Sequence, residues 1–123
     1  MHALVIENHF FIATMVEDEL RDLGYDSIEV VDSEQEAIAA AAQCCPDLIT
    51  ADQRLASGTG VEAIRTICEQ QPIPVVSITG YGEEVRELIP DAVVLAKPFV
   101  PRLLREAVEQ AIAVIEPGLD AKG

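Results

Sequence analysis

The chain has few basic residues, which limits the partners that it can bind directly. Of its 123 residues, 8 are Lys or Arg and 22 are Asp or Glu, and the formal net charge at pH 7 is -14. Such a charge repels the phosphates of nucleic acids and of anionic lipids. The composition therefore argues against direct binding to nucleic acid or to a membrane surface, whereas a deep acidic site would attract cations.

Cysteines and long apolar runs are also scarce. Cys44, Cys45 and Cys68 are odd in number and lack the spacing of zinc ligands, so we expect reduced thiols and a cytoplasmic location. No run of ~18 apolar residues could span a bilayer. Strand-like sequence begins at Ala3, which leaves no room for a signal peptide.

Half of the residues are hydrophobic, too many for a disordered chain despite its charge. A chain of this length buries about two-thirds of its unfolded surface as one domain. The sequence contains no linker, repeat or second apolar unit. We therefore expect a single domain over residues 1–123, complete as a small protein rather than part of a longer hybrid kinase.

Short apolar runs alternate with helical patterns along the whole chain. The runs predict strands over residues 3–6, 27–31, 48–51, 74–79 and 92–96. Between them, capping boxes begin at Ser33 and Thr59, Gly24 ends the first helix, and Pro101 opens the last one. The pattern predicts an α/β fold: a doubly wound, five-stranded parallel sheet in the flavodoxin-like order 2-1-3-4-5 with five helices. Residues 82–89 leave room for only a short fourth helix.

The apolar positions of the first and last helices predict which faces are buried. In the first helix the predicted stripe is Ile12, Val16, Leu20 and Leu23. In the last helix the predicted stripe is Leu103, Leu104, Ala107, Val108, Ala111, Ile112 and Ile115.

Polar side chains stand at the ends of four predicted strands. Glu7 and Asn8 follow the first strand, Asp52 ends the third, Thr79 ends the fourth and Lys97 follows the fifth. In open α/β sheets, ligands bind beyond the carboxyl ends of the strands. We therefore expect these side chains to converge on one shallow pocket.

This set of residues suits the transfer of a phosphoryl group onto a carboxylate. Asp52 would be the nucleophile and would form an acyl phosphate. The hydroxyl of Thr79 and the ammonium group of Lys97 can donate hydrogen bonds to phosphoryl oxygens. In such a reaction the protein mainly positions groups and stabilises charge.

The same pocket offers oxygen ligands for a hard divalent cation, which we expect to be Mg²⁺. Asp52 and Asn8 carry side-chain oxygens, and Glu7 can bind directly or through water. A backbone carbonyl just after Asp52, assigned to Arg54, can complete the set.

Four segments of the chain resemble the response-regulator receiver domains of two-component signalling. They are residues 4–8 (LVIEN), 46–52 (PDLITAD), 75–80 (VVSITG) and 95–99 (LAKPF), and the resemblance extends from residue 4 to about residue 115. Any one segment alone is weak evidence, but all four in this order are specific.

The resemblance implies a function for the pocket. A phosphohistidine on a histidine kinase or phosphotransfer protein would donate to Asp52, and phosphorylation would draw Thr79 inward. The Lys97–Pro98 peptide bond would be cis, which proline makes energetically accessible. We therefore expect a stand-alone receiver that signals by protein contact or phosphate relay and is not a turnover enzyme.

Three features depart from the usual family pattern. Asn8 stands where a second acidic residue is usual, which predicts weaker Mg²⁺ binding that an Asn8→Asp variant would restore in a magnesium titration. Val94 stands where many receivers carry an aromatic switch residue. Thr79 and Lys97 are only 18 positions apart. Asn8 and Val94 leave open a pseudo-receiver that binds partners without phosphorylation.

Other readings compete at single positions. Phe10 and Phe11 either dock a kinase, as the resemblance implies for the first helix, or cover the edge of the sheet. Asn8 could be the N-cap of that helix. His9 is better explained as a helix-start residue than as a metal ligand. Arg54 and Tyr81 are candidates to flank the phosphoryl group.

Two enzyme classes of similar topology receive no support. A flavin or nucleotide enzyme would need a Gly-rich phosphate loop after the first strand, where Glu7 and Asn8 stand. A haloacid-dehalogenase-like phosphatase would carry its nucleophilic aspartate at that same place.

Overall fold

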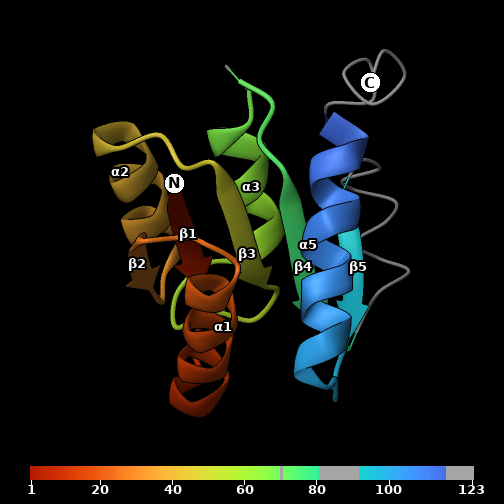
Figure 1. Ribbon diagram of the computed structural model, residues 1–123. Coiled ribbons are helices and arrows are strands. Elements are labelled where there is room, and N and C mark those ends of the chain that lie inside the picture. Colours follow the sequence, from red (N-terminus) through yellow and green to blue (C-terminus); the bar gives the residue numbers. More distant parts are fainter. Residues whose placement is uncertain (70, 81–91, 116–123) are drawn as a thin grey trace.

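Five parallel strands form the centre of the protein, in the order β2-β1-β3-β4-β5 (Figure 1). The computed structural model describes residues 1–69, 71–80 and 92–115. The strands are β1 (His2–Ile6), β2 (Ser27–Val31), β3 (Leu48–Asp52), β4 (Val75–Thr79) and β5 (Val93–Ala96). The described helices are α1 (Phe10–Asp22), α2 (Glu34–Gln43), α3 (Gly60–Ile67) and α5 (Pro101–Ile115). The predicted fold class and strand order are therefore confirmed, while the predicted fourth helix and Tyr81 lie outside the described residues.

The sheet separates two apolar layers. Alternate residues of each strand point to opposite faces, so Ala3 and Val5 of β1 pack with α1 and α5, whereas Leu4 and Ile6 pack with α2 and α3. All five residues of β3 and all five of β4 are buried, as expected for central strands covered on both faces. β2 is an edge strand and pairs only with β1 among the described strands.

Local sequence signals place the helix ends. The side-chain oxygens of Ser33 and Thr59 accept hydrogen bonds from the backbone N–H groups of Glu36 and Glu62, at 3.2 and 3.3 Å, which confirms both predicted N-caps. Gly24 follows α1 with a φ of 105°, a conformation that a side chain would strain. These signals fix where the connecting loops begin, and hence where the polar strand ends lie.

The structure excludes one alternative for Asn8 and corrects the predicted buried face of α5. Asn8 is not the N-cap of α1; that position is His9, whose side chain makes no capping hydrogen bond. In α5 the buried residues are Leu104, Ala107, Val108 and Ala111, whereas Leu103 and Ile112 are 39% and 37% exposed. The buried stripe is narrower than predicted because one face of a helix contacts the sheet, and apolar residues beside that face remain in solvent.

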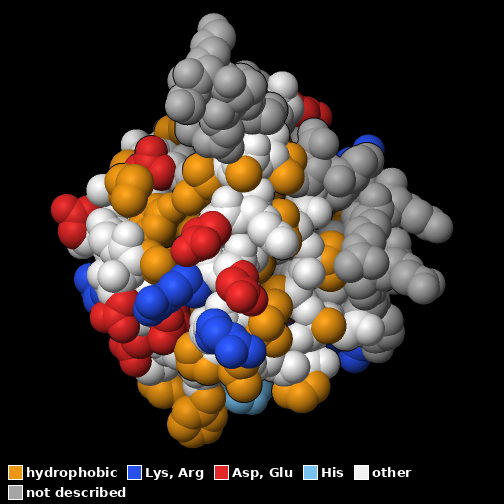
Figure 2. Space-filling model, turned by 45° about the vertical axis from the view of Figure 1, so that its right-hand side comes forward, with side chains coloured by type: hydrophobic (Ala, Val, Ile, Leu, Met, Phe, Trp, Pro, Cys, Tyr) orange, Lys and Arg blue, Asp and Glu red, His pale blue; other side chains and the backbone are white. Residues whose placement is uncertain are grey.

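The side of the molecule that carries α5 has a mixed surface. Figure 2 shows acidic and basic side chains next to one another among hydrophobic ones. Arg105 of α5 and Glu19 of α1 form an ion pair at 3.2 Å that joins the two helices. No helix of the described residues is both long and apolar enough to cross a membrane. All three cysteines are free thiols.

Candidate functional site

The third and fifth strands bring Asp52 and Lys97 into direct contact. Asp52 is the last residue of β3, and Lys97 follows β5 directly. The Nζ atom of Lys97 donates a hydrogen bond to Oδ2 of Asp52 at 3.1 Å. The Asp52 side chain is only 9% exposed and that of Lys97 is 30% exposed. A nearly buried carboxylate thus faces a partly solvated cation at the rim of the sheet.

Thr79 lies between these two strands. It ends β4, which pairs with β3 on one side and with β5 on the other, and it is 2% exposed. Its backbone carbonyl accepts a hydrogen bond from the N–H of Lys97 at 3.3 Å. The Lys97–Pro98 peptide bond that follows is cis, as the family resemblance implies. Thr79 therefore occupies the strand end adjacent to those of Asp52 and Lys97.

Glu7 is a buried carboxyl group with an unusual environment. It is 4% exposed, and its Oε2 atom accepts a hydrogen bond from the N–H of His9 at 3.0 Å. Its Oε1 atom is buried and has no hydrogen-bond partner among the described residues. Burial, together with the repulsion of Asp52, raises the pKa of Glu7 to about 7. The fold thus holds two carboxyl groups close together, with one oxygen atom unsatisfied.

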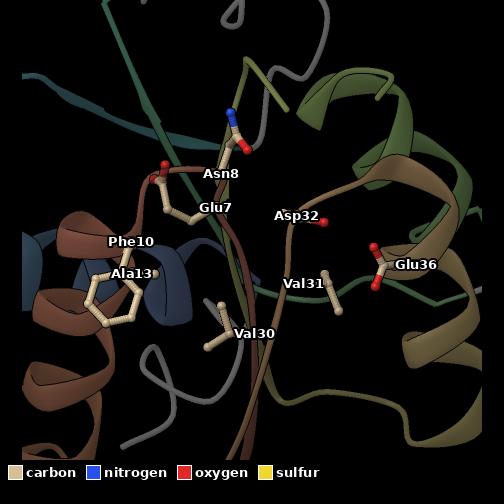
Figure 3. Close-up of a pocket in the computed structure, with 8 residues that line it drawn as sticks. All are labelled: Glu7, Asn8, Phe10, Ala13, Val30, Val31, Asp32 and Glu36. Atoms are coloured by element: carbon tan, nitrogen blue, oxygen red, sulfur yellow. The ribbon is translucent and has the colours of Figure 1, made fainter. Parts of the chain in front are cut away.

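Asn8 lies on the outer side of this pair. It is exposed and lines a shallow hollow of about 370 Å³ between α1, β2 and the start of α2. Figure 3 shows Glu7 and Asn8 at the end of β1, with Val30 of β2 below them and Glu36 of α2 across the hollow. The side chains of Glu7 and Asn8 extend away from Val30.

The donor set of this site fits a hard cation. Glu7 and Asp52 carry two neighbouring carboxyl groups, and Asn8, directly after Glu7, carries an amide oxygen. The unsatisfied buried oxygen of Glu7 is the feature that a cation ligand would explain. Within residues 1–69, 71–80 and 92–115, no three His, Cys, Asp or Glu side chains form a metal-binding group. A bound Mg²⁺ would therefore depend on amide and carbonyl oxygens as well as on carboxylates.

Three aromatic rings gather at the start of α1. Phe10 and Phe11 are 76% and 75% exposed, and their rings meet edge to face with centroids 5.7 Å apart. The ring of His9 lies 6.0 Å from that of Phe11. The expectation that these phenylalanines cover the sheet edge is thus contradicted by their exposure.

Two residues beside the site were not predicted. Oε1 of Gln53 accepts a hydrogen bond from the N–H of Val61 at 3.1 Å, and Oε1 of Glu34 accepts one from the N–H of Thr59 at 3.3 Å. Gln53 could have been suspected because it follows Asp52 directly. Glu34 could not, since it is 18 positions before Asp52 and belongs to an ordinary capping box.

Known proteins resemble this chain along most of its length. Residues 3–109 match the family model of the response regulator receiver domain. The phyllosphere-induced regulator PhyR of Methylorubrum extorquens is 34% identical over 113 residues, which cover 89% of this chain and 42% of PhyR. The transcriptional regulatory protein PdtaR of Mycobacterium tuberculosis is 28% identical, over 89% of this chain and 56% of PdtaR.

Solved structures agree with the sequence comparison. The solution structure of the receiver (REC) domain of PhyR from Erythrobacter litoralis has a TM-score of 0.81 and 31% identity, covering 94% of this chain and 92% of that one. A response regulator receiver protein from Sinorhizobium medicae has a TM-score of 0.83 and 26% identity, covering 94% and 97%. The chain spans less than two thirds of the length of these curated relatives, so what it shares with them is one domain. The chain belongs to the family of response regulator receiver domains of two-component signalling.

Proposed function

We propose that this receiver domain accepts a phosphoryl group on Asp52 from the phosphohistidine of a histidine kinase or of a phosphotransfer protein. A carboxylate oxygen of Asp52 attacks phosphorus, the P–N bond to the histidine breaks, and the electron pair stays on the imidazole, which takes up a proton. The products are an acyl phosphate on Asp52 and a free histidine on the donor. The contact between Asp52 and Lys97 at 3.1 Å is the observation that carries this proposal.

The neighbouring side chains suit the charge that develops during transfer. Lys97 already lies within hydrogen-bond distance of Asp52, so its ammonium group is placed to stabilise phosphoryl oxygens. Thr79, on the strand between them, would donate its hydroxyl to the phosphoryl group once that group is present. Neither side chain transfers a proton or forms a covalent bond. Both position the phosphoryl group and stabilise its charge.

We assign the Mg²⁺ ligands of this site to Glu7, Asn8, Asp52 and the backbone carbonyl of Arg54. The cation would supply positive charge against the phosphoryl oxygens. The unsatisfied oxygen of Glu7 supports this assignment. Because Asn8 brings an oxygen without a charge, we expect weaker Mg²⁺ binding than in receivers with two adjacent acidic residues.

Intact-mass measurement after incubation with acetyl phosphate and Mg²⁺ tests the phosphoacceptor. We expect one added phosphoryl group on the wild-type chain and none on Asp52→Ala. A matched control is Asp18→Ala, which removes an exposed carboxylate from the middle of α1 and should leave labelling unchanged. Phosphoramidate serves as a second small donor.

The competing function, a pseudo-receiver, makes the opposite prediction. Asn8 and Val94 favour it, because one charge of the metal site and the usual aromatic switch residue are both missing. A wild-type chain that takes no phosphoryl group from either donor, or one that is still labelled in Asp52→Ala, would contradict the proposal.

We propose that the donor protein docks on Phe10 and Phe11. Two exposed, adjacent aromatic rings beside the site are costly to leave in water unless a partner covers them. With the autophosphorylated kinase that best labels the wild type in a panel, the double variant Phe10→Ala/Phe11→Ala should transfer at least tenfold more slowly. Its labelling by acetyl phosphate should be unchanged, and equal transfer from the kinase would refute the docking site.

The output of the domain is then a protein contact or a further phosphate transfer in the cytoplasm. The charge of -14 opposes direct binding to nucleic acid, and the free thiols suit a reducing compartment. Signalling rather than turnover chemistry is also the common feature of the receiver family to which the chain belongs.

A further inference from the structure

We propose that Glu34 is a positioning residue that holds the loop between β3 and α3, residues 53–59, and thereby places the backbone carbonyl of Arg54 beside Asp52. The proposal rests on the proposed function, because Arg54 matters only if its carbonyl binds the cation. Glu34 lies at the start of α2, so a residue from a different part of the chain would help to position the ligands of the site.

Glu34 contacts the loop through both its backbone and its side chain. Its backbone N–H donates to the carbonyl of Ser57 at 3.0 Å, and its Oε1 atom accepts from the N–H of Thr59 at 3.3 Å. One residue earlier, Ser33 forms a parallel β-bridge with Ser57. The loop is therefore attached to the beginning of α2 at several consecutive points.

The loop is also shaped around the Glu34 side chain. Gly58 has a φ of 79°, which favours glycine, and a Cβ atom there would lie 2.5 Å from both Cβ and Oε1 of Glu34. The two residues thus fit against each other with no room for a further atom. Because Gly58 is the most flexible residue type, a side chain that fills the space against it restrains the loop at its weakest point.

Thr59 carries the restraint from Glu34 to the site. Thr59 pairs with Arg54 in an antiparallel β-bridge, and the N–H of Gly60 donates to the carbonyl of Gln53 at 3.1 Å. The loop therefore turns back on itself, with Arg54 paired to the residue that Glu34 holds. If Glu34 no longer accepts the hydrogen bond from the Thr59 N–H, Thr59 is held less firmly, and so is Arg54, which pairs with it.

A well-placed carbonyl matters more here because Asn8 brings no charge. With only two carboxylates in the site, binding depends on neutral oxygens whose attraction for a cation is weaker and more sensitive to distance. Residues that orient the ligands of a metal site typically change its affinity about tenfold or more when they are removed.

Calorimetric titration of the unphosphorylated chain with MgCl₂ tests this role. We expect Glu34→Ala to raise the magnesium Kd roughly tenfold. Glu34→Gln should stay within about twofold of wild type, because an amide oxygen can still accept a hydrogen bond from the Thr59 N–H. Glu29→Ala is the matched control: it removes one exposed carboxylate from β2, away from the hollow and the loop, and should bind as the wild type does.

Amide hydrogen exchange gives a second readout that does not depend on the metal. We expect the Thr59 N–H to exchange faster in Glu34→Ala than in Glu34→Gln or Glu29→Ala, while the thermal midpoints of the variants show that each is folded. If Glu34→Ala binds magnesium as tightly as the wild type, this inference alone is contradicted. It is also contradicted if all three variants bind magnesium equally more weakly, because that would indicate a general effect of charge. A wild-type chain that binds no Mg²⁺ would contradict the proposed metal site and the inference with it.

Discussion

Substitution of Gly60 by alanine is expected to disrupt the phosphoacceptor site by displacing the backbone of Asp52. Gly60 is the first residue of α3 and is buried. A Cβ atom added there would lie 2.1 Å from the backbone carbonyl oxygen of Asp52 and 2.9 Å from its carbonyl carbon. Backbone atoms of a central strand cannot move aside as a flexible side chain can. The start of α3 must therefore shift, or Asp52 must.

Helix propensity alone predicts the opposite sign. Alanine in a helix is favoured over glycine by about 1 kcal/mol, and Gly60 has no positive φ that would require glycine. The steric conflict outweighs this gain, and we expect Gly60→Ala to lower the free energy of unfolding by roughly 2 kcal/mol, as other overpacked sites do. A displaced Asp52 should also slow labelling by acetyl phosphate about 100-fold, since errors near 1 Å have such effects in active sites.

Gly80→Ala is the matched control. Gly80 lies just beyond β4, and a Cβ atom added there would meet no atom of the described residues within 4 Å. Denaturant unfolding and intact-mass labelling of both variants would show whether the effect comes from the steric conflict at Gly60 or from the loss of a glycine as such. If Gly60→Ala unfolds at the same denaturant concentration as the wild type and is labelled at the same rate, the close approach to Asp52 has no consequence.

The sheet could be predicted from the sequence because its signals are local. Apolar runs as short as residues 48–51, closely bounded by turn residues, suit buried strands better than helices, and short connections leave few possible strand orders. The same reasoning placed Asp52 and Lys97 at one edge of the sheet, where they do meet. Strand ends are predictable because the topology alone brings them together.

Contacts between loops could not be predicted, because they depend on three-dimensional fit. Nothing in the capping box at Ser33 indicates that Glu34 would reach Thr59, and the capping role is itself satisfied by Glu36. The narrow stripe of α5 is a similar case: Leu103 is as apolar as Leu104, yet only the latter meets the sheet. Periodicity predicts which residues can be buried, while the neighbouring element decides which are.

The raised pKa of Glu7 also could not be predicted from the sequence. An acidic residue after a strand looks like any solvated carboxylate, and its raised pKa comes from burial beside Asp52. In an unfolded chain a glutamate titrates near 4.5, but in the fold Glu7 titrates at about 7. The folded state therefore holds the Glu7 proton over a pH range in which the unfolded state has lost it.

Replacement of Glu7 by glutamine is accordingly expected to stabilise the chain at neutral and higher pH when no divalent cation is present. Because the folded state binds more protons between pH 4.5 and about 7, the stability of the wild type falls as pH rises through this range. Glutamine is neutral throughout, so the variant escapes this loss. The difference at pH 8 should be between about 1 and 3 kcal/mol, given 1.36 kcal/mol for each unit of pKa shift.

The neighbouring groups suit a glutamine in this position. Its amide oxygen can accept the N–H of His9, as Oε2 of Glu7 now does, and its amide nitrogen can donate toward the Asp52 carboxylate. Asp32→Asn, at an exposed carboxylate after β2, is the matched control and should change stability by less than about 0.5 kcal/mol.

Urea unfolding at pH 5 and pH 8, with EDTA and with excess MgCl₂, would measure these effects. At pH 5 both glutamate and glutamine are neutral in the fold, so the two chains should differ little. Magnesium should stabilise the wild type more than Glu7→Gln, since a ligand that binds only the folded state adds stability in proportion to its affinity. A Glu7→Gln chain that is less stable than the wild type at pH 8 in EDTA would mean that burial of this carboxyl group does not destabilise the metal-free fold. If Glu7→Gln is more stable than the wild type in EDTA but not in excess magnesium, the carboxylate of Glu7 destabilises the metal-free fold and contributes to magnesium binding.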